Sequence, residues 1–330
     1  MKLIDTYNRH IDYLRISITD HCNFRCFYCT PFSGRNHLSK SKILSYEELL
    51  KVSEAAVSAG ITKIRITGGE PLVRKGVVEF CRMLSNIKGL RSLTLTTNGL
   101  LLKEMAASLF EAGIRRINVS LDTLKPERFQ KITGYNLLSN VLAGIKKAEE
   151  VGMHPIKINM VVMRGINYDE IEEMVNITFK KPYHVRFIEL MPTEGWDFEH
   201  HKSLFIPLEE VMKRIGEIGK IQIEPAKNSN GPAKIYVLPG AKGILGFISP
   251  LGRHFCGACN RLRLTADGNL RPCLFSKNEI DIKRLLRDGA ALETLADVFR
   301  QAAIKKPQGH NLDKIDVQRT FGRAMQGIGG

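Results

Sequence analysis

The sequence predicts an α/β protein: an incomplete TIM-type parallel barrel of about six βα units, followed by a smaller C-terminal region. Three observations predict this fold. Short β-branched stretches alternate with stretches of helical periodicity, no antiparallel hairpin signal separates them, and small polar residues follow the predicted strands. The 330 residues, 43% hydrophobic and 25% charged, are sufficient for one large or two ordinary domains.

The repeated unit can be followed along the chain. Six strands are predicted, at Leu14–Thr19, Lys63–Thr67, Ser92–Thr97, Arg116–Leu121, Lys157–Val162 and Val185–Glu189. Helices are predicted at Ser45–Ala59, Lys75–Ile87, Lys103–Glu111, Asn140–Val151 and Asp169–Lys180. Gly60, Gly113 and Gly152 each follow a helix, where glycine can adopt the left-handed cap conformation. In such folds the chemistry gathers at the carboxyl ends of the strands.

The pattern changes after about Pro192. Gly, Pro and Asn cluster at Asn228–Pro232 and Pro239–Gly246, around short predicted strands at Lys234–Leu238 and Ile244–Ile248. We therefore predict a barrel core over residues 1–190 and a C-terminal region over residues 191–330, which ends in a glycine-rich tail.

Charge and hydropathy narrow the classes of partner. Lys and Arg total 49 against 34 Asp and Glu, a formal net charge of +15, which favours polyanionic partners. The basic residues are dispersed without a block of five or six, so we expect no nucleic acid partner. The apolar runs are of strand length and no signal peptide is evident, so we expect a cytoplasmic protein without a membrane partner.

Cys22, Cys26 and Cys29 form a first cysteine cluster, spaced C-x3-C-x2-C in the loop after the first predicted strand. In the reducing cytosol such cysteines favour metal binding over disulfides. Structural zinc normally takes four protein ligands, whereas this loop offers three. Three thiolates suit a [4Fe–4S] cluster whose fourth iron is open to S-adenosylmethionine. Buried or zinc-bound cysteines are the alternative, and the isolated Cys81 is expected to be a buried small hydrophobe.

These features resemble the radical S-adenosylmethionine (radical SAM) superfamily. Its C-x3-C-x-aromatic-C motif is matched with Tyr28 as the aromatic residue, and its GGEP segment is matched by Gly68-Gly69-Glu70-Pro71 directly after a predicted strand. Glycine at that place lets the backbone approach a ligand closely. Alone, this segment would be an ordinary turn; together with the cysteine motif it is specific.

Cys256, Cys259 and Cys273 form a second cluster, spaced C-x2-C-x13-C. Two interpretations stay open. One is a zinc site completed by His254 or His310, and the other is a second [4Fe–4S] cluster that again leaves one iron without a protein ligand. The second interpretation is favoured once the first iron–sulfur site is accepted, and an open iron can bind substrate.

Arg261 and Arg263 lie between Cys259 and Cys273 and would point to one side of an extended strand, where paired guanidinium groups suit a phosphate or a guanine edge. With them the resemblance narrows to the GTP 3′,8-cyclases of molybdenum cofactor biosynthesis, and it extends over nearly the whole chain. Besides the two cysteine clusters, the matching segments are Leu14–Ser17, Lys63–Pro71, Thr96–Gly99, Arg116–Asp122, Arg186–Glu189, Gly195–Phe198 and the terminal Gly329-Gly330.

The resemblance implies a role for each matching residue. It implies two [4Fe–4S] clusters, each held by three cysteines. The residues that would line the S-adenosylmethionine site are Tyr28, Gly69, Ser120 and Met191. Those that would bind GTP are Arg15, Arg65, Thr96, Lys157, Arg261 and Arg263, of which Arg15, Arg261 and Arg263 would be catalytic. Arginine and lysine on three inward-facing strands would bury unpaired charge unless an anion, such as a triphosphate, is bound.

The resemblance also implies a reaction and its partners. A 5′-deoxyadenosyl radical would take hydrogen from the ribose C3′ of GTP, and the resulting radical would close a bond to C8 of guanine. An electron donor such as flavodoxin or ferredoxin, and the cyclic pyranopterin monophosphate synthase downstream, would be partners, and a homodimer is compatible. Two alternatives stay open: a two-cluster radical enzyme that modifies peptides, and a zinc-containing nucleic-acid-binding module that uses the +15 charge.

Overall fold

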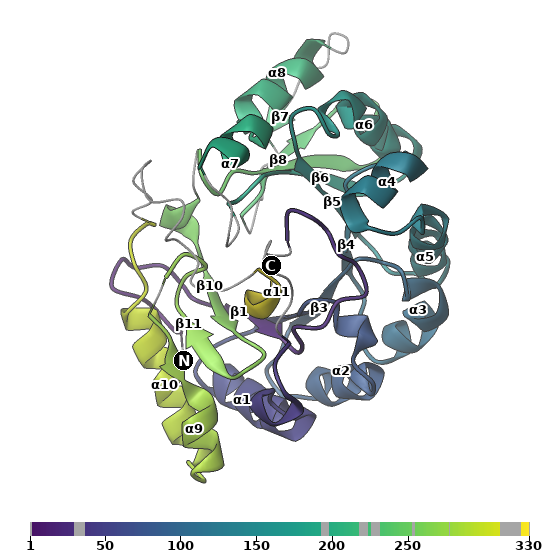
Figure 1. Cartoon of the computed structure of the whole chain (residues 1–330). Coiled ribbons are helices and arrows are strands. Elements are labelled where there is room, and N and C mark those ends of the chain that lie inside the picture. Colours follow the sequence, from purple (N-terminus) through teal and green to yellow (C-terminus); the bar gives the residue numbers. More distant parts are fainter. Residues whose placement is uncertain are drawn as a thin grey trace.

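The computed structural model describes residues 2–29, 37–192, 198–217, 224–225, 232–252, 255–276, 278–310 and 325–329. Within these residues one sheet of twelve strands curves around a centre, with helices along its outer side (Figure 1). The strand order is β12-β11-β10-β1-β2-β3-β4-β5-β6-β9-β8-β7. This architecture confirms the predicted α/β fold built on a parallel, barrel-like sheet.

The six predicted strands are present and lie side by side in chain order, all parallel. Their bounds are β1 Tyr13–Ser17, β2 Lys63–Thr67, β3 Ser92–Thr97, β4 Ile117–Ser120, β5 Ile156–Val162 and β6 His184–Glu189. Each begins or ends within two residues of its prediction, because the β-branched runs that predict the strands are also the segments that pack under the helices.

Later strands extend the sheet on both sides of these six. The strands predicted at Lys234–Leu238 and Ile244–Ile248 are confirmed, but their pairing with the barrel sheet was not predicted. β9 (Ile244–Ile248) pairs parallel with β6, and β10 (Arg261–Leu264) pairs parallel with β1. Antiparallel strands continue each edge: β8 Lys234–Val237 and β7 Glu224–Pro225 beyond β9, and β11 Asn269–Arg271 and β12 Ile280–Asp281 beyond β10. The division at residue 190 stays a prediction, but strands from both sides of it share this sheet.

The helices of the βα units cover the outer side of the sheet (Figure 1). They are α1 Tyr46–Ser58, α2 Val77–Ser85, α3 Leu102–Glu111, α4 Pro126–Thr133, α5 Leu138–Glu150 and α6 Ile171–Lys180. Sequence periodicity predicted all of these but the short α4. The later helices are α7 Phe198–Leu204, α8 Leu208–Glu217, α9 Ile282–Arg287, α10 Leu292–Ile304 and α11 Met325–Ile328. None of the helices in the described part of the chain is long and apolar enough to span a bilayer.

Local signals fix the ends of several helices. Ser45 caps α1 in a capping box, where its hydroxyl accepts a hydrogen bond from the Glu48 N–H at 3.2 Å and its own N–H donates to the Glu48 carboxylate at 2.7 Å. Gly60, Gly113 and Gly152 have φ values of 113°, 99° and 90°, which confirms their predicted left-handed conformation. Cys81 in α2 is fully buried, as predicted for a small hydrophobe.

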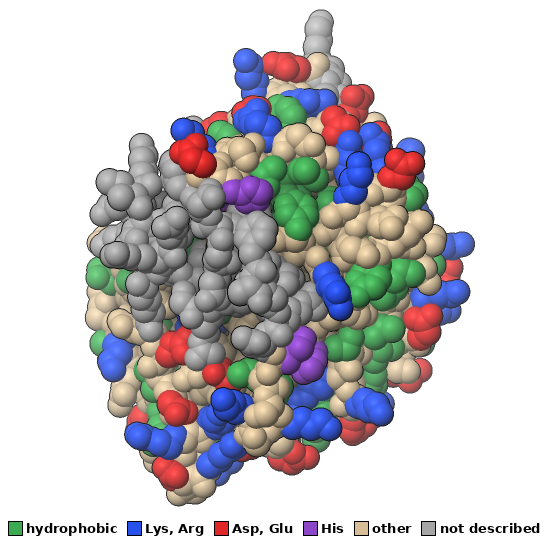
Figure 2. Space-filling model, viewed as in Figure 1, with side chains coloured by type: hydrophobic (Ala, Val, Ile, Leu, Met, Phe, Trp, Pro, Cys, Tyr) green, Lys and Arg blue, Asp and Glu red, His purple; other side chains and the backbone are tan. Residues whose placement is uncertain are grey.

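The two sides of each strand differ in polarity, and this difference positions the site. On β1 and β2 the residues Leu14, Ile16, Ile64 and Ile66 are fully buried beneath the helices. The alternate residues of the same strands, such as Arg15, are polar and face the inside of the curved sheet. Hydrophobic burial therefore occurs on the outer side, and the inner side is left for polar chemistry. On the face shown in Figure 2, basic and acidic side chains are interspersed around the rim.

Candidate active site

The first cysteine cluster lies in the loop that follows β1, at the carboxyl edge of the parallel sheet, and all three of its cysteines are partly exposed. The Cys29 N–H donates to the Cys26 carbonyl at 3.0 Å, which makes a tight turn between them. The Asn98 side-chain amide, at the end of β3, lies 3.9 Å from the Cys22 sulfur. The end of β3, two strands away from β1 in the sheet, therefore contacts the loop.

The glycine turn after β2 packs directly against this loop. The Gly69 N–H donates to the Thr19 carbonyl at 2.7 Å, and the Glu70 N–H donates to the His21 carbonyl at 2.7 Å. A Cβ atom at Gly69 would lie 2.4 Å from the His21 oxygen, closer than real Cβ contacts allow. The glycine is thus required by backbone-to-backbone contact beside the cysteine loop.

Glu70 ties the glycine turn to the end of β3. Its carboxylate accepts hydrogen bonds from the Thr97 hydroxyl at 2.8 Å and from the Asn98 N–H at 2.6 Å. Burial raises the pKa of Glu70 to about 7, while these hydrogen bonds pull the pKa down. Glu70 is therefore a structural acceptor that joins the β2 turn, the β3 end and, through Asn98, the Cys22 segment.

Tyr28, between Cys26 and Cys29, is held by Asp122 at the end of β4. The Tyr28 hydroxyl donates to Asp122 Oδ2 at 2.6 Å, and the Val161 N–H donates to the other carboxylate oxygen at 2.8 Å. Burial raises the pKa of Asp122 to about 6. The sequence showed Asp122 only as the last residue of the matching segment Arg116–Asp122, and its contact with the cysteine loop could not be inferred from that position.

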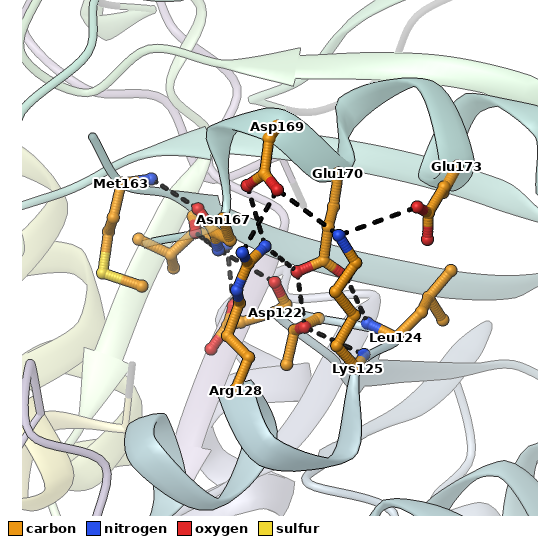
Figure 3. A network of polar contacts seen from close by, with 11 residues as sticks. Asp122, Leu124, Lys125, Arg128, Met163, Asn167, Asp169, Glu170 and Glu173 are labelled. Carbon is orange, nitrogen blue, oxygen red and sulfur yellow. Dashed lines mark hydrogen bonds and ion pairs between the residues drawn. The ribbon is translucent and has the colours of Figure 1, made fainter. Parts of the chain in front are cut away.

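A network of hydrogen bonds and ion pairs fixes the backbone at Asp122 (Figure 3). Asn167 donates from its side-chain amide to the Asp122 carbonyl at 2.8 Å. Glu170, fully buried, accepts from the Thr123 hydroxyl at 2.6 Å and pairs with Arg128. These contacts join the loops after β4 and β5, so the position of Asp122 is fixed by two strand ends.

We expect the Tyr28–Asp122 contact to position the cysteine loop. Tyr28→Phe, which keeps the ring and removes the donor, should raise the KM for S-adenosylmethionine several-fold because the ring loses the bond that orients it. The free energy of unfolding should fall by about 1 kcal/mol. Tyr135→Phe, at an exposed ring, is the control for both measurements. An unchanged KM in Tyr28→Phe would contradict the positioning role.

The predicted substrate residues come together on the inner side of the sheet. Arg15 on β1 lies in register with Arg65 on β2 and with Arg263 on β10. Thr96 and Lys157, on β3 and β5, are both in register with Asn118 on the intervening strand β4. The structure therefore places three of the predicted arginines in one row. Thr96 and Lys157 lie in a second row on the same inner side, because Arg65 pairs with Thr94, two residues before Thr96.

The electrostatics of this inner side fit an anionic ligand. Burial, with Arg263 beside it, lowers the pKa of Arg15. Burial and Arg261 lower the pKa of Arg263 to about 10, and burial and Arg186 lower the pKa of Lys157 to about 7. Like charges thus face one another in a partly desolvated space, which is costly unless a polyanion is bound.

Arg186 also lies on this cationic inner side, in register with Asn159 on β5, and the sequence assigned it no role. It lies on β6, is 9% exposed, and its Nε has no hydrogen-bond acceptor among the described residues. Burial and Arg65 lower its pKa to about 10. Polar atoms of Thr96, Asn159 and His184 are likewise buried without a hydrogen-bond partner in the described ranges. The alternation of Arg186 with apolar neighbours on β6 was the sequence signal for its inward orientation.

The second cysteine cluster forms one recess beside this row. The recess is lined by Cys256, Cys259, Cys273, Arg261, Arg263, Lys306, His310, Pro250, Phe255, Leu274 and Phe275. Burial raises the pKa of Cys259, but Arg261 and Lys306 bring it down to about 6, so its thiolate is favoured. His310 Nε2 lies 2.6 Å from the Pro250 carbonyl oxygen, and His254 lies outside the described residues.

The C-terminal segment reaches the inner side of the sheet, where α11 lies near the centre (Figure 1). Gly329 is buried, and its carbonyl accepts a hydrogen bond from Arg263 at 3.1 Å. A Cβ atom at Gly329 would lie 2.3 Å from the Thr67 hydroxyl oxygen, and its φ of 75° also favours glycine. Gly330 and Gly195–Asp197 lie outside the described residues.

The two remaining predicted cofactor residues also lie at strand ends. Ser120 is the last residue of β4, in register with Asn159 on β5, and Met191 follows β6 with its side chain partly buried. Both are therefore at the carboxyl edge that carries the first cysteine cluster.

A curved parallel sheet with a cysteine motif at its carboxyl edge is the arrangement of the radical SAM class. A model of the Radical SAM superfamily matches residues 16–177, and a model described as Molybdenum Cofactor Synthesis C matches residues 183–312. A GTP 3′,8-cyclase of Thermodesulfovibrio yellowstonii is 52% identical over 309 residues, which cover 92% of this chain and 94% of the relative. A GTP 3′,8-cyclase of Heliobacterium modesticaldum is 45% identical over 99% of this chain and 100% of the relative. The chain belongs to the GTP 3′,8-cyclase family.

Solved structures agree on the fold. Streptococcus suis SuiB bound to S-adenosylmethionine aligns with a TM-score of 0.60 at 16% identity, over 89% of this chain and 69% of that chain. The anSMEcpe structure with bound AdoMet aligns with a TM-score of 0.57 at 15% identity, over 92% and 79%. Family membership supports S-adenosylmethionine and a [4Fe–4S] cluster as cofactors.

Proposed function

We propose that this protein is a radical SAM lyase that converts GTP into (8S)-3′,8-cyclo-7,8-dihydroguanosine 5′-triphosphate, the first step of molybdenum cofactor biosynthesis. The observation that carries the proposal is the row of cations on the inner side of the sheet. This row begins at Arg263, which lines the second cysteine recess. It continues through Arg15 on β1, the strand that leads to the first cysteine loop, to Arg65 on β2. A substrate bound to that row lies within reach of groups held at both cysteine sites.

The donor sets fit the groups assigned to them. Cys22, Cys26 and Cys29 would hold one [4Fe–4S] cluster, and Cys256, Cys259 and Cys273, which line one recess, would hold the other. Tyr28, Gly69, Ser120 and Met191 would line the S-adenosylmethionine site. When bound, the first cluster and S-adenosylmethionine supply one-electron chemistry that produces a radical able to remove hydrogen from a substrate.

The side chains of the inner row bind and orient the nucleotide. Arg15, Arg65, Lys157 and Arg186 supply positive charge for a triphosphate, and Thr96 offers a hydroxyl oxygen that lacks a partner among the described residues. Arg261 and Arg263 continue from the second cysteine recess to Arg15, so Arg15, Arg261 and Arg263 contact the reacting part of the substrate. Gly329, held by Arg263, brings backbone rather than a bulky side chain to this centre.

The Gly69 N–H already donates to the Thr19 carbonyl, so carbonyl oxygens of the glycine turn would accept hydrogen bonds from the amino group of S-adenosylmethionine.

Flavodoxin or ferredoxin is the proposed class of electron donor, and cyclic pyranopterin monophosphate synthase is the proposed enzyme that consumes the product. The proposal keeps the division into residues 1–190 and 191–330 as functional regions, one for each cluster.

The test is anaerobic reconstitution followed by quantification of iron and sulfide. The chain should contain about eight irons, and Cys256→Ala should lose about half of the iron and sulfide. Release of 5′-deoxyadenosine should depend on GTP. Four irons in the unmodified chain, zinc in place of iron, or deoxyadenosine release indifferent to GTP would each contradict the proposal.

Lys157 makes GTP binding depend on pH. Its pKa of about 7 lies below that of an exposed lysine, so between about pH 7 and 10 the unfolded chain holds a proton that the ligand-free fold lacks. Stability of the ligand-free protein should therefore rise with pH through that window. A bound triphosphate restores the proton, so the affinity for GTP should fall from pH 7 to pH 9. Isothermal titration in buffers of different ionisation enthalpy should show proton uptake at pH 8, and Lys157→Met should abolish that uptake.

A further inference from the structure

A buried lysine lines the second cysteine recess. Lys306, just after α10, is 3% exposed and lines the recess together with the three cysteines. Its ammonium group donates to the Arg261 carbonyl at 2.8 Å and to the Pro272 carbonyl at 2.7 Å. Neither the sequence pattern nor the proposed function assigns this residue a role.

The two carbonyls identify what Lys306 joins. Arg261 is two residues after Cys259, and Pro272 is directly before Cys273. One ammonium group therefore connects the two chain segments that carry Cys259 and Cys273. Arg9 holds the third segment in a similar way, because it donates to the Cys256 carbonyl at 2.7 Å.

The two cations differ in how their charge is balanced. Arg9 forms a buried ion pair with Asp5 at 2.5 Å. Lys306 is also buried, but it has no carboxylate within ion-pair distance in the part of the chain that the structure describes. Burial lowers the pKa of Lys306, and the nearby sulfurs of Cys259 and Cys273 raise it. The two carbonyl oxygens accept hydrogen bonds from the ammonium group but carry no net charge. The negative charges that act on Lys306 are those of the Cys259 and Cys273 thiolates.

We propose that Lys306 is the counter-ion of the cluster held by Cys256, Cys259 and Cys273, and that it both positions two of the cysteine segments and raises the reduction potential of that cluster. The inference rests on the proposed second cluster. Reduction adds one negative charge to a cluster that three thiolates already make anionic, so a fixed positive charge beside it stabilises the reduced form more than the oxidised form.

The experiment isolates the second cluster in the full chain. A variant with Cys22, Cys26 and Cys29 all changed to Ala should keep about four irons, and its midpoint potential can be followed by electron paramagnetic resonance during a redox titration. Lys306→Met and Lys306→Arg are compared in that background. Lys305→Met is the matched control, because Lys305 is the neighbouring lysine and is exposed.

Lys306→Met should shift the midpoint potential to a more negative value, whereas Lys306→Arg and Lys305→Met should leave it near that of the background chain. A potential in Lys306→Met equal to that in Lys305→Met would overturn the inference. If Lys306→Met loses its iron, retention of four irons by Lys306→Arg at an unchanged unfolding temperature supports the counter-ion role, and equal iron loss in both overturns it. A background chain without iron contradicts the second cluster itself.

Discussion

Gly69→Ala is expected to abolish turnover and to lower the iron content at the first cysteine loop. The added methyl group would lie 2.4 Å from the His21 oxygen and 2.7 Å from the Asp20 oxygen. Both atoms are backbone, so no side-chain rotation relieves the contact, and the glycine turn must move away from the loop that carries Cys22. Overpacking of this kind costs about 3 kcal/mol.

The loss should be visible in two independent measurements. Chemical denaturation should show a lower free energy of unfolding, and 5′-deoxyadenosine release should fall below detection even where iron remains. Gly216→Ala in α8 is the control, because a Cβ atom there meets no other atom within 4 Å. A Gly69→Ala variant with normal turnover would show that the turn tolerates displacement and does not shape the cofactor site.

Arg186→Met is expected to weaken GTP binding without weakening the fold. The loss of a hydrogen bond from a charged donor to phosphate is worth about 2 kcal/mol, so the KM for GTP should rise about 30-fold. The ligand-free protein should unfold at an unchanged or higher temperature, because the variant removes a buried charge that faces Arg65 and has no ion-pair partner among the described residues.

This opposite effect on binding and stability separates a ligand-binding arginine from a structural one. Steady-state kinetics and thermal unfolding of the same preparation provide both values. Arg82→Met, at an exposed arginine paired with Glu79 on α2, should change neither. If Arg186→Met lowered the unfolding temperature by several degrees at an unchanged KM, Arg186 would be a core residue and the proposed phosphate site would lie elsewhere.

The sequence predicted the parallel units well because each depends on local patterns. Alternation of β-branched residues, the Ser45 capping box and the glycines after α1, α3 and α5 are all read over a few neighbouring residues. The cysteine clusters were recognisable for the same reason, since each motif lies within a short segment. The pairing of β9 with β6 and of β10 with β1 was harder to predict, because it joins segments that are far apart in the sequence.

The side-chain contacts that organise the site could not be predicted from the sequence. The bond from Tyr28 to Asp122 joins residues 94 positions apart, and the bond from Lys306 to Pro272 joins residues 34 positions apart. Arg186 differs from a surface arginine only in the direction it faces. Position in the chain does not give burial, and burial decides whether a charge is solvated or needs a ligand.

By itself, the sequence determined the order of the βα units, the spacing of the two cysteine clusters and the glycine turn, because side-chain spacing and backbone preference act between near neighbours. The tertiary structure alone decided which strands form the edges of the sheet, which cations face inwards and which buried groups support the cysteines. Those outcomes follow from the pairing of distant segments, since desolvation and like-charge repulsion are set by what surrounds a side chain in space.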